Sequence, residues 1–496
     1  MRSLLKDMLG YLPAQIVPAI AGIAFLPLIT RFLSPKEYGY YTLVLATVSV
    51  LTVITGWLNM AVVRFYPASK EEEGLKALYS SIFIWLGLSI VVLETIFLSV
   101  TSAFSHMMPA GLYEGMLLGG LLFALLAVVN VLQTLLRAQR LIYWYTAFTI
   151  WKTLAGLGLG VWLVIAWNNG VKGLLWGSII ALIFAIPFLW RVSTRGIPFK
   201  LGDFSLDLSK EMAKYSFPLV VGNLAAWILS LSDRYVLGLF RGAFEVGLYS
   251  VGYRISEYSI MLLTSLFALA FNPLSIIVWE KQGEKAARRF LEQGTRYFLI
   301  MCLPAVAGIT VLQKPIVALL AAPEYGEGAV VLPWVATGVF FLGLAQRFGA
   351  GLSFRKQTTP SMLCILAAGG LNLLLNFAFI PSYGFRAAAA STAVSYALLL
   401  MLMVWVSRRF FQWAFPFRSL VRASTASIVM GVVVYSLSNS LSLSPVISLI
   451  ISVPVGIAVY FVVLFLLGEV RSNEKRAVKQ VLARCLPGKL TPNSWK

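Results

Sequence analysis

The strings Glu37-Tyr38-Gly39-Tyr40-Tyr41 and Glu245-Val246-Gly247-Leu248-Tyr249 share the pattern E-x-G-x-Y and lie 208 positions apart. Each string follows one long apolar block and opens the next. The block before each string contains a proline and ends near an arginine, namely Pro13 with Arg31 and Pro218 with Arg234. A chain that repeats its opening in this way is predicted to contain two like halves.

Composition excludes an ordinary soluble protein. Apolar residues make up 59% of the 496 positions and charged residues only 12%, and the mean hydropathy is +0.83. A soluble domain is closer to half apolar and a quarter charged. A soluble chain of this length would also divide into domains joined by polar linkers, and the sequence has none.

Apolar blocks long enough to cross a bilayer recur along the chain and predict an all-α polytopic membrane protein. We expect about fourteen transmembrane helices, at residues 8–30, 40–63, 77–100, 116–137, 143–166, 172–190, 215–239, 247–271, 296–320, 330–352, 362–380, 386–407, 420–439 and 445–467. The first block is too long for a cleaved signal peptide and runs into Arg31 without a small-residue cleavage site. It is therefore expected to act as a signal anchor.

The basic residues predict the orientation. Of the 40 lysines and arginines, 31 fall in the terminal segments and alternate connections of one set, 5 fall in the opposite set, and 4 lie inside spans. Cytoplasmic loops carry the excess of basic residues in membrane proteins. Both termini are therefore expected in the cytoplasm of a bacterial or archaeal cell, with the chain in the cytoplasmic membrane.

Six predicted spans separate the two E-x-G-x-Y strings, so both halves enter the membrane in the same direction. In a membrane protein, two such parallel repeats are typical of a transporter whose substrate binds between them. We expect a six-helix lobe at 1–190, a cytoplasmic linker at 191–214, a second six-helix lobe at 215–410, two further spans at 411–468, and a basic tail at 469–496. The linker is expected to end in an amphipathic interfacial helix that starts near Asp207, and the tail is expected either to contact anionic lipids or to be solvated.

Several functional classes are disfavoured. A net charge of +20 normally raises nucleic acid as a partner, but here most of the charge is explained by membrane orientation. The three cysteines and the single histidine have no metal-ligand spacing, so no metal site is expected. Neither a phosphate-binding G-x-x-x-x-G-K-[ST] string nor a loop large enough for a catalytic domain is present, so neither ATP hydrolysis nor a catalytic residue is expected.

Three stretches resemble a known family. The run Pro27-Leu28-Ile29-Thr30-Arg31-Phe32-Leu33-Ser34-Pro35-Lys36-Glu37-Tyr38-Gly39-Tyr40-Tyr41 resembles the first signature of the polysaccharide-biosynthesis flippases, which export lipid-linked oligosaccharides such as O-antigen units. Arg64-Phe65-Tyr66 fits the same family. Asp233-Arg234-Tyr235, followed by Glu245-Val246-Gly247-Leu248-Tyr249-Ser250, resembles the matching element of the family's second half. These flippases belong to the multidrug/oligosaccharidyl-lipid/polysaccharide superfamily.

The resemblance implies a flippase that moves an undecaprenyl-diphosphate-linked oligosaccharide from the inner to the outer leaflet for cell-surface polysaccharide synthesis. It implies two V-shaped lobes that expose a central cavity by alternating access. No cofactor is expected, although a proton or Na⁺ gradient would be a suitable energy source. Glycosyltransferases or a glycan polymerase are the protein partners that this role implies.

Basic residues within or near the spans are the candidates for binding the diphosphate, because a charge within the bilayer usually faces a cavity or a partner. The candidates are Lys152, Arg234, Arg31, Arg254, Arg64 and Arg347. Lys152 lies near the midplane with no acid within four positions. If its side chain does not face a cavity, we expect it to snorkel towards the interface or to pair with a distant acid. Arg31 and Arg234 are expected to form a pseudo-symmetric pair at the outer mouth, or else to anchor their spans at the interface.

Each of the remaining basic candidates has an alternative explanation. Adjacent residues point to different faces of a helix, so Asp233 need not neutralise Arg234 and could pair with another residue. Arg254 stands three residues before Glu257, a spacing that permits a local salt bridge. Arg64 and Arg347 lie toward the cytoplasmic ends of their spans, where orientation alone explains them equally well.

The embedded acids Glu94, Asp233 and Glu257 are candidates for binding a coupling proton or Na⁺, the alternative being that each pairs with a nearby base. Embedded amides would either hydrogen-bond sugars or, as is more usual, join helices, and they are Gln15, Asn59, Asn130, Gln133, Asn223, Asn272, Gln346, Asn372 and Asn376.

Two other functions compete with the flippase. A multidrug exporter of the same superfamily would need an acidic cavity for its cationic substrates and usually has twelve spans. A membrane-embedded glycan polymerase or ligase would need reactive residues in a sizeable outer loop, and the longest outer connection, at about 101–115, carries only His106 and Glu114 as ionisable groups.

Overall fold

The computed structural model describes the chain except for residues 1, 70, 196–199, 441–443 and 472–496, and the described part is helical without strands. The helices are α1 (Arg2–Ala24), α2 (Leu26–Phe32), α3 (Pro35–Thr55), α4 (Trp57–Phe65), α5 (Glu72–Ala103), α6 (Ala110–Ala138), α7 (Ile142–Trp167), α8 (Gly170–Thr194), α9 (Leu206–Phe240), α10 (Ala243–Val311), α11 (Gln313–Leu320), α12 (Val331–Phe354), α13 (Thr358–Phe410), α14 (Phe417–Ser440) and α15 (Pro445–Leu466). The 3-10 turns η1 (Ser105–Met107), η2 (Leu201–Asp203) and η3 (Pro323–Val330) join some of them.

Twelve helical stretches are long and apolar enough to cross a bilayer. Two of the helices are hairpins: α10 contains Gly283 with φ 78° and ψ −176°, and α13 contains Gly384 with φ 60° and ψ −143°. Glycine adopts this region without strain, so the chain can turn back there with little loss of helix. The part of α10 before Phe271 and the second arm of α13 bring the twelve stretches to fourteen crossings, which confirms the predicted polytopic all-α fold.

The sequence explains how the first crossings are built. Pro27 lies at the start of α2, so the first crossing breaks at Phe25 into α1 and α2. Ser34 then caps α3 in a capping box, in which its hydroxyl accepts from the Glu37 backbone N–H and the Glu37 carboxylate accepts from the Ser34 backbone N–H at 2.9 Å. The E-x-G-x-Y string therefore starts a helix at a fixed residue, as its position after a short polar break predicts.

Helices α7 and α8 pack through small residues. Gly156 and Gly160 on α7 and Gly173 and Gly177 on α8 are each spaced by four positions, so each pair lies on one face of its helix. A methyl group on Gly177 would overlap the backbone of Gly160. This close backbone approach is the usual way in which membrane helices associate, because lipid tails remove most of the hydrophobic drive.

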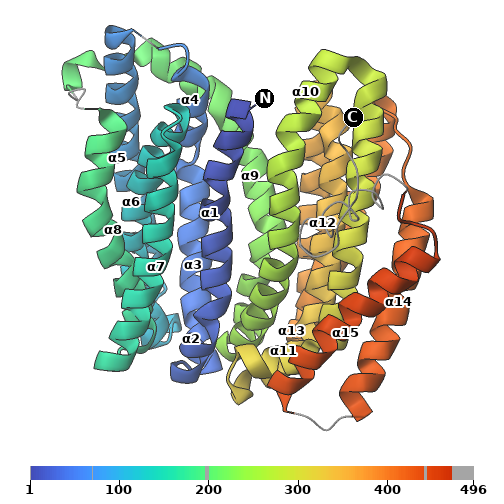
Figure 1. Ribbon diagram of the computed structural model, residues 1–496. Helices are drawn as coiled ribbons and strands as arrows, with labels where there is room; N and C mark the ends of the chain where they lie inside the picture. The colour runs from blue at the N-terminus through green and yellow to red at the C-terminus, as the bar shows by residue number, and fades with distance from the viewer. Residues whose placement is uncertain (1, 70, 196–199, 441–443, 472–496) are drawn as a thin grey trace, which may run out of the picture.

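Figure 1 shows how the helices are grouped: α5 to α8 stand on one side, and α10, α12 and α13 stand on the other. Helices α1, α3 and α9 lie between them, and α14 and α15 flank the second group, where α14 packs against α10 and α15. The division into lobes at 1–190 and 215–410 stays a prediction. The linker predicted at 191–214 is largely helical, because α8 continues to Thr194 and α9 begins at Leu206 after the cap Ser205, whose hydroxyl accepts from Leu208 N–H at 3.2 Å.

The two E-x-G-x-Y strings lie against each other. A methyl group on Gly39 would overlap the carbonyl oxygen of Ala243, and a methyl group on Gly247 would overlap the carbonyl oxygen of Pro35. The offset of 208 positions that relates Gly39 to Gly247 also relates Pro35 to Ala243, so the two contacts are reciprocal. Helices α3 and α10 therefore meet backbone to backbone at their N-terminal ends.

Further contacts close this end of the molecule. The hydroxyl of Tyr325 in η3 donates to the Leu33 carbonyl at 2.8 Å, and the Ala322 backbone N–H donates to the Thr30 hydroxyl at 3.1 Å. The crossings alternate in direction, so the connections after α2, α5, α7, α9 and α11 share this face, which we call the outer face. The opposite face carries most of the basic residues, and we call it the basic face.

We predict that Gly39→Ala and Gly247→Ala each destabilise the protein by about 1–3 kcal/mol, because the added methyl group forces α3 and α10 apart. The thermal unfolding midpoint of the purified protein in detergent would report the loss. Gly87→Ala is the matched control, since nothing lies within 4 Å of the position that its methyl group would take. Equal midpoints for the three variants would show that the glycine contact does not hold the two helices together.

Candidate functional site

A polar cavity of about 420 Å³ opens between α3, α4, α6 and α9, towards the basic face. Three asparagines line it, Asn59 from α4, Asn130 from α6 and Asn223 from α9. Thr52, Thr134, Arg137 and Tyr215 add hydroxyl and guanidinium groups, and none of the lining residues is acidic. The cavity therefore offers hydrogen bonds and positive charge to a polar ligand.

Local sequence places these groups. Helix α3 ends at Gly56, where the chain bends into α4, and the lack of a side chain at Gly56 leaves part of the cavity wall as bare backbone. Asn130, Thr134 and Arg137 are spaced by four and three positions, which puts all three on one face of α6. The carbonyl oxygen of the Asn59 side chain is buried and has no hydrogen-bond partner. A buried acceptor of this kind is costly unless a ligand or water satisfies it.

Arg137 lines the cavity and Arg64 lies beside Tyr215 of its wall, and neither arginine has a carboxylate partner in the described chain. The guanidinium of Arg64 lies 6.0 Å from the centre of the Tyr215 ring, and that of Arg137 lies 5.8 Å from the Tyr145 ring. Both side chains are exposed. Arg64 is one of the predicted residues, whereas Arg137 had been explained by orientation alone. Its spacing from Asn130 and Thr134 is the signal that would have identified it.

Lys152 on α7 is half-buried and is not among the residues that line this cavity. Its ammonium group forms no hydrogen bond or ion pair with any described residue. The neighbouring Thr149 accepts a hydrogen bond from the Gln133 side chain at 3.4 Å, which shows that this stretch of α7 faces α6. Lys152 therefore remains an unpaired charge within the membrane and remains a candidate.

The Asp233–Arg234 pair corrects one expectation. The Arg234 guanidinium donates to Asp233 Oδ1 at 2.9 Å, and both residues are almost fully buried, at 5% and 0% exposure. The side chains of Asp233 and Arg234 leave the helix in different directions. The long arginine side chain nevertheless folds back, so its guanidinium reaches the carboxylate. Arg234 also packs over the Tyr253 ring at 4.4 Å. Its charge is paired with that of Asp233, whereas Arg31 is exposed at the end of α2, and the outer-mouth pair of Arg31 and Arg234 stays a prediction.

The Asp233 carboxylate accepts three hydrogen bonds, in a network that joins three helices. The hydroxyls of Tyr249 and Thr392 both donate to Asp233 Oδ2, the latter at 3.3 Å. Asn372 and Asn376 extend the polar network on α13, where the Asn376 amide donates to Asn372 Oδ1 at 2.9 Å. The network thus joins α9, α10 and α13.

The salt bridge that the spacing of Arg254 and Glu257 permits does not form. The described structure contains no ion pair between these residues. Arg254 instead lies 5.9 Å from the ring centres of both Tyr38 and Tyr258, so it reaches from α10 to α3 across the interface between the halves. Glu257 is half-buried nearby without a hydrogen bond or ion pair to a described residue.

The last two candidates lie in apolar surroundings. Arg347 is buried, and its guanidinium lies 4.5, 5.0 and 5.3 Å from the ring centres of Phe267, Phe271 and Phe298. Its Nε and Nη2 atoms have no partner, so ring faces take the place of a carboxylate. Glu94 on α5 faces Gly120, and its Oε2 atom is buried without a partner. Within the described residues no cluster could hold a metal ion.

The sequence profile of the family described as "Polysaccharide biosynthesis protein" matches residues 28–329. The chain belongs to this family. The matched region contains both E-x-G-x-Y strings and all three asparagines of the cavity. The resemblance seen in the sequence is thereby confirmed.

Two curated relatives come from Haloferax volcanii. The chain is 21% identical over 266 residues to the "Probable low-salt glycan biosynthesis flippase Agl15", which covers 53% of this chain and 54% of that protein. It is 25% identical over 276 residues to the "Probable flippase AglR", covering 54% and 56% respectively. The chain thus spans about half the length of the curated relatives it matches.

Solved structures share the fold at low sequence identity. The "Lipid II flippase MurJ, inward closed conformation" superposes with a TM-score of 0.75 at 16% identity, over 92% of this chain and 98% of that chain. An inward-facing multidrug-resistance transporter of the MATE family and MOP superfamily gives a TM-score of 0.65 at 14% identity, over 80% and 94%. The chain therefore shares the fold of these two multi-pass membrane proteins.

We predict that Asp233→Asn destabilises the protein by about 3–5 kcal/mol, because it leaves the buried Arg234 guanidinium without its counter-charge. Thermal unfolding in detergent measures the effect. The double variant Asp233→Asn/Arg234→Gln should recover part of the loss, since it removes both charges together. Glu280→Gln, on an exposed carboxylate of α10, is the control. An unfolding midpoint of Asp233→Asn equal to that of the control would mean that the pair is not needed.

Proposed function

We propose that this protein moves an undecaprenyl-diphosphate-linked oligosaccharide from the inner to the outer leaflet of the cytoplasmic membrane. The observation that carries the proposal is the cavity lined by amides and arginine, without an acidic residue, between α3, α4, α6 and α9. Membership of the polysaccharide biosynthesis family and the flippase names of two relatives support it.

The composition of the cavity suits such a substrate. A glycan and a diphosphate lose their hydration when they enter the bilayer, and this is costly unless protein groups replace the water. Amide side chains can donate to and accept from sugar hydroxyls, and a guanidinium matches phosphate oxygens in a bidentate way. The isoprenoid tail needs no such help, because it can remain in lipid throughout.

The surroundings of the charges suggest three different roles for these arginines and the lysine. Arg64, Arg137 and Lys152 have no carboxylate partner in the described chain, and they are proposed to attract the diphosphate. Arg254 spans the interface between α10 and α3, so it would sense how the halves move relative to each other. Arg234 is proposed to have a structural role, because Asp233 neutralises it.

Coupling to a proton or Na⁺ gradient is proposed to use Glu257 or Glu94 rather than Asp233. The Asp233 carboxylate already accepts hydrogen bonds from Arg234, Tyr249 and Thr392, which leaves little room for a cation. Glu257 lies two helical turns beyond Tyr249 on the same helix and has no such partners. Glycosyltransferases or a glycan polymerase would work on either side of this step as partners.

We predict that Arg137→Gln and Asn130→Ala each slow flipping about tenfold, because each removes one hydrogen-bonding group from the substrate's path. Purified protein in proteoliposomes, given a fluorescent undecaprenyl-diphosphate glycan, would show this as slower loss of inner-leaflet label. Arg191→Gln removes an exposed charge of α8 that does not line the cavity, and it should flip at the normal rate. Slowing of Arg191→Gln equal to that of Arg137→Gln would assign the arginine effect to bulk charge, and a normal rate for Asn130→Ala would remove the amide from the path.

The competing multidrug-exporter function is supported by the shared fold alone. It predicts efflux of a cation such as ethidium driven by an ion gradient, and the cavity without acids predicts that ethidium is not moved. We expect proteoliposomes that flip the glycolipid to retain ethidium under either a proton or a Na⁺ gradient. Ethidium efflux without glycolipid flipping would favour the exporter.

A further inference from the structure

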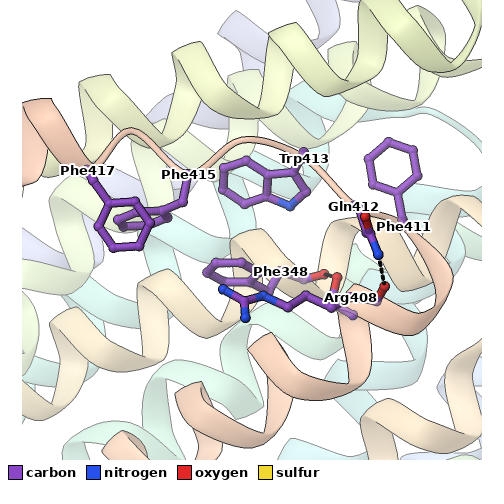
Figure 2. Close-up of a pocket in the computed structure, with 8 residues that line it drawn as sticks. Phe348, Arg408, Phe411, Gln412, Trp413, Phe415 and Phe417 are labelled. Carbon is purple, nitrogen blue, oxygen red and sulfur yellow. Dashed lines mark hydrogen bonds between the residues drawn. The ribbon is translucent and has the colours of Figure 1, made fainter.

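A short extended segment crosses the basic face of the second half. It consists of Phe411-Gln412-Trp413-Ala414-Phe415-Pro416-Phe417 and joins α13 to α14, and we call it the aromatic strap. Figure 2 shows Trp413, Phe415 and Phe417 on the strap, with Phe348 of α12 and Arg408 of α13 on the helices beneath it. The Phe348 ring lies 4.9 Å from Trp413 and 6.1 Å from Phe415, so the strap is held down on α12 by ring contacts.

A cavity of about 240 Å³ lies under the strap, lined by its aromatic side chains, Gln412, Phe348 and Arg408. The Arg408 guanidinium is exposed and forms no hydrogen bond or ion pair within the described chain. Trp413 Nε1–H is buried there without an acceptor. The Gln412 amide donates to the Arg408 carbonyl at 3.1 Å, which holds the strap over the end of α13.

The one buried side-chain group that lines this cavity without a partner in the described chain is a donor, Trp413 Nε1–H. No carboxylate lines it, and the described structure gives no acceptor to the backbone N–H groups of residues 412–415. An indole N–H enclosed by rings is costly without a hydrogen bond. A ligand with acceptor oxygens and negative charge would satisfy both the indole and the guanidinium, and a phosphoryl group has both properties.

A second interaction fixes the platform on which the strap ends. Glu469, which follows α15, accepts from Arg296 of α10 at 2.5 Å, from Ser419 of α14 at 2.6 Å and from Arg422 at 3.1 Å. Burial raises the pKa of Glu469, but these hydrogen bonds outweigh it and hold the pKa below its usual value. The ends of α14 and α15 are thus tied to α10, and the strap spans two fixed supports.

The location of the cavity indicates where its ligand comes from. Arg408 and Arg409 form the last turn of α13, and the strap follows directly, so the cavity lies at the level of the lipid headgroups. Tryptophan is enriched at this level, and basic pockets at the cytoplasmic ends of membrane helices bind anionic headgroups. The rings of Phe348, Phe415 and Phe417 offer an apolar surface to the glycerol and the first acyl carbons.

We propose that the cavity under the aromatic strap binds the phosphoryl group of an anionic phospholipid from the leaflet at the basic face. Arg408 neutralises the phosphoryl charge, and Trp413 Nε1–H donates to one of its oxygens. The bound lipid then fills the space between the second half and α14. This site is separate from the polar cavity between α4, α6 and α9, and it does not depend on which substrate is transported.

The test measures lipid binding to the full-length protein by native mass spectrometry, with phosphatidylglycerol added to delipidated protein in detergent. We expect Arg408→Gln to raise the phosphatidylglycerol Kd about tenfold, which is the effect of losing one charge-assisted hydrogen bond. Trp413→Phe keeps a ring but removes the indole donor, and a rise of about threefold to tenfold is expected. Arg409→Gln is the matched control, since its guanidinium lies 4.0 Å from the Trp405 ring and does not line the cavity.

The outcomes are decisive. Equal rises for Arg408→Gln and Arg409→Gln would show bulk attraction to anionic lipid and would overturn the site. Free glycerol phosphate that binds as tightly as phosphatidylglycerol would overturn the lipid source. Phosphatidylcholine should bind wild type more weakly than phosphatidylglycerol does, because the choline ammonium offsets the charge of its phosphoryl group, and equal binding of the two lipids would overturn the preference for an anionic headgroup. Unchanged gel-filtration profiles would show that the variants are folded. If Trp413→Phe does not fold, the Arg408→Gln variant tests the site without it.

Discussion

The glycine contact between α3 and α10 is the constraint on which the rest of the arrangement depends. At Gly39 and Gly247 the two backbones come closer than an added methyl group would permit. Gly39 contacts the carbonyl of Ala243, the first residue of α10, and Gly247 contacts the carbonyl of Pro35, the first residue of α3. Membrane helices gain little from hydrophobic association, so such close packing provides much of the attraction between them. Helices α3 and α10 are joined at the outer face. The polar cavity, which Asn59, Asn130 and Asn223 line, therefore lies towards the basic face.

The glutamates of the two strings stabilise the same end of the molecule in parallel ways. Glu37 lies beside Gly170, at the turn that leads into α8, where a side chain on Gly170 would come within 3.1 Å of the carboxylate. Glu245 accepts from the Phe385 backbone N–H at 3.0 Å, next to Gly384. Both glycines have positive φ, so each turn needs glycine and each is covered by a carboxylate. The glutamate of each string therefore contacts a turn in its own part of the chain, and the glycine of each string packs against the start of the other string's helix.

Much of this could be predicted from the sequence, because apolar length and basic asymmetry are properties of whole segments. The fourteen crossings followed from the apolar blocks, and the repeated E-x-G-x-Y strings predicted two like halves. The predictions that were wrong concern how individual charged side chains pair, because this depends on where the ends of long side chains reach. Asp233 and Arg234 pair although their stems diverge, and Arg254 and Glu257 remain apart although their spacing permits a bridge. Tertiary neighbours decide such contacts, and a single sequence does not contain them.

The distribution of neutralised charge assigns different tasks to the two halves. In the second half, Arg234 is compensated by Asp233, and Arg347 is enclosed by three phenylalanine rings. In the first half, Arg64, Arg137 and Lys152 have no carboxylate partner in the described chain. An uncompensated cation in a low-dielectric setting attracts an anion far more strongly than a paired one does. On the proposed function, a diphosphate would be drawn to α4, α6 and α7, and the polar network of α9, α10 and α13 would provide the stable body against which those helices move.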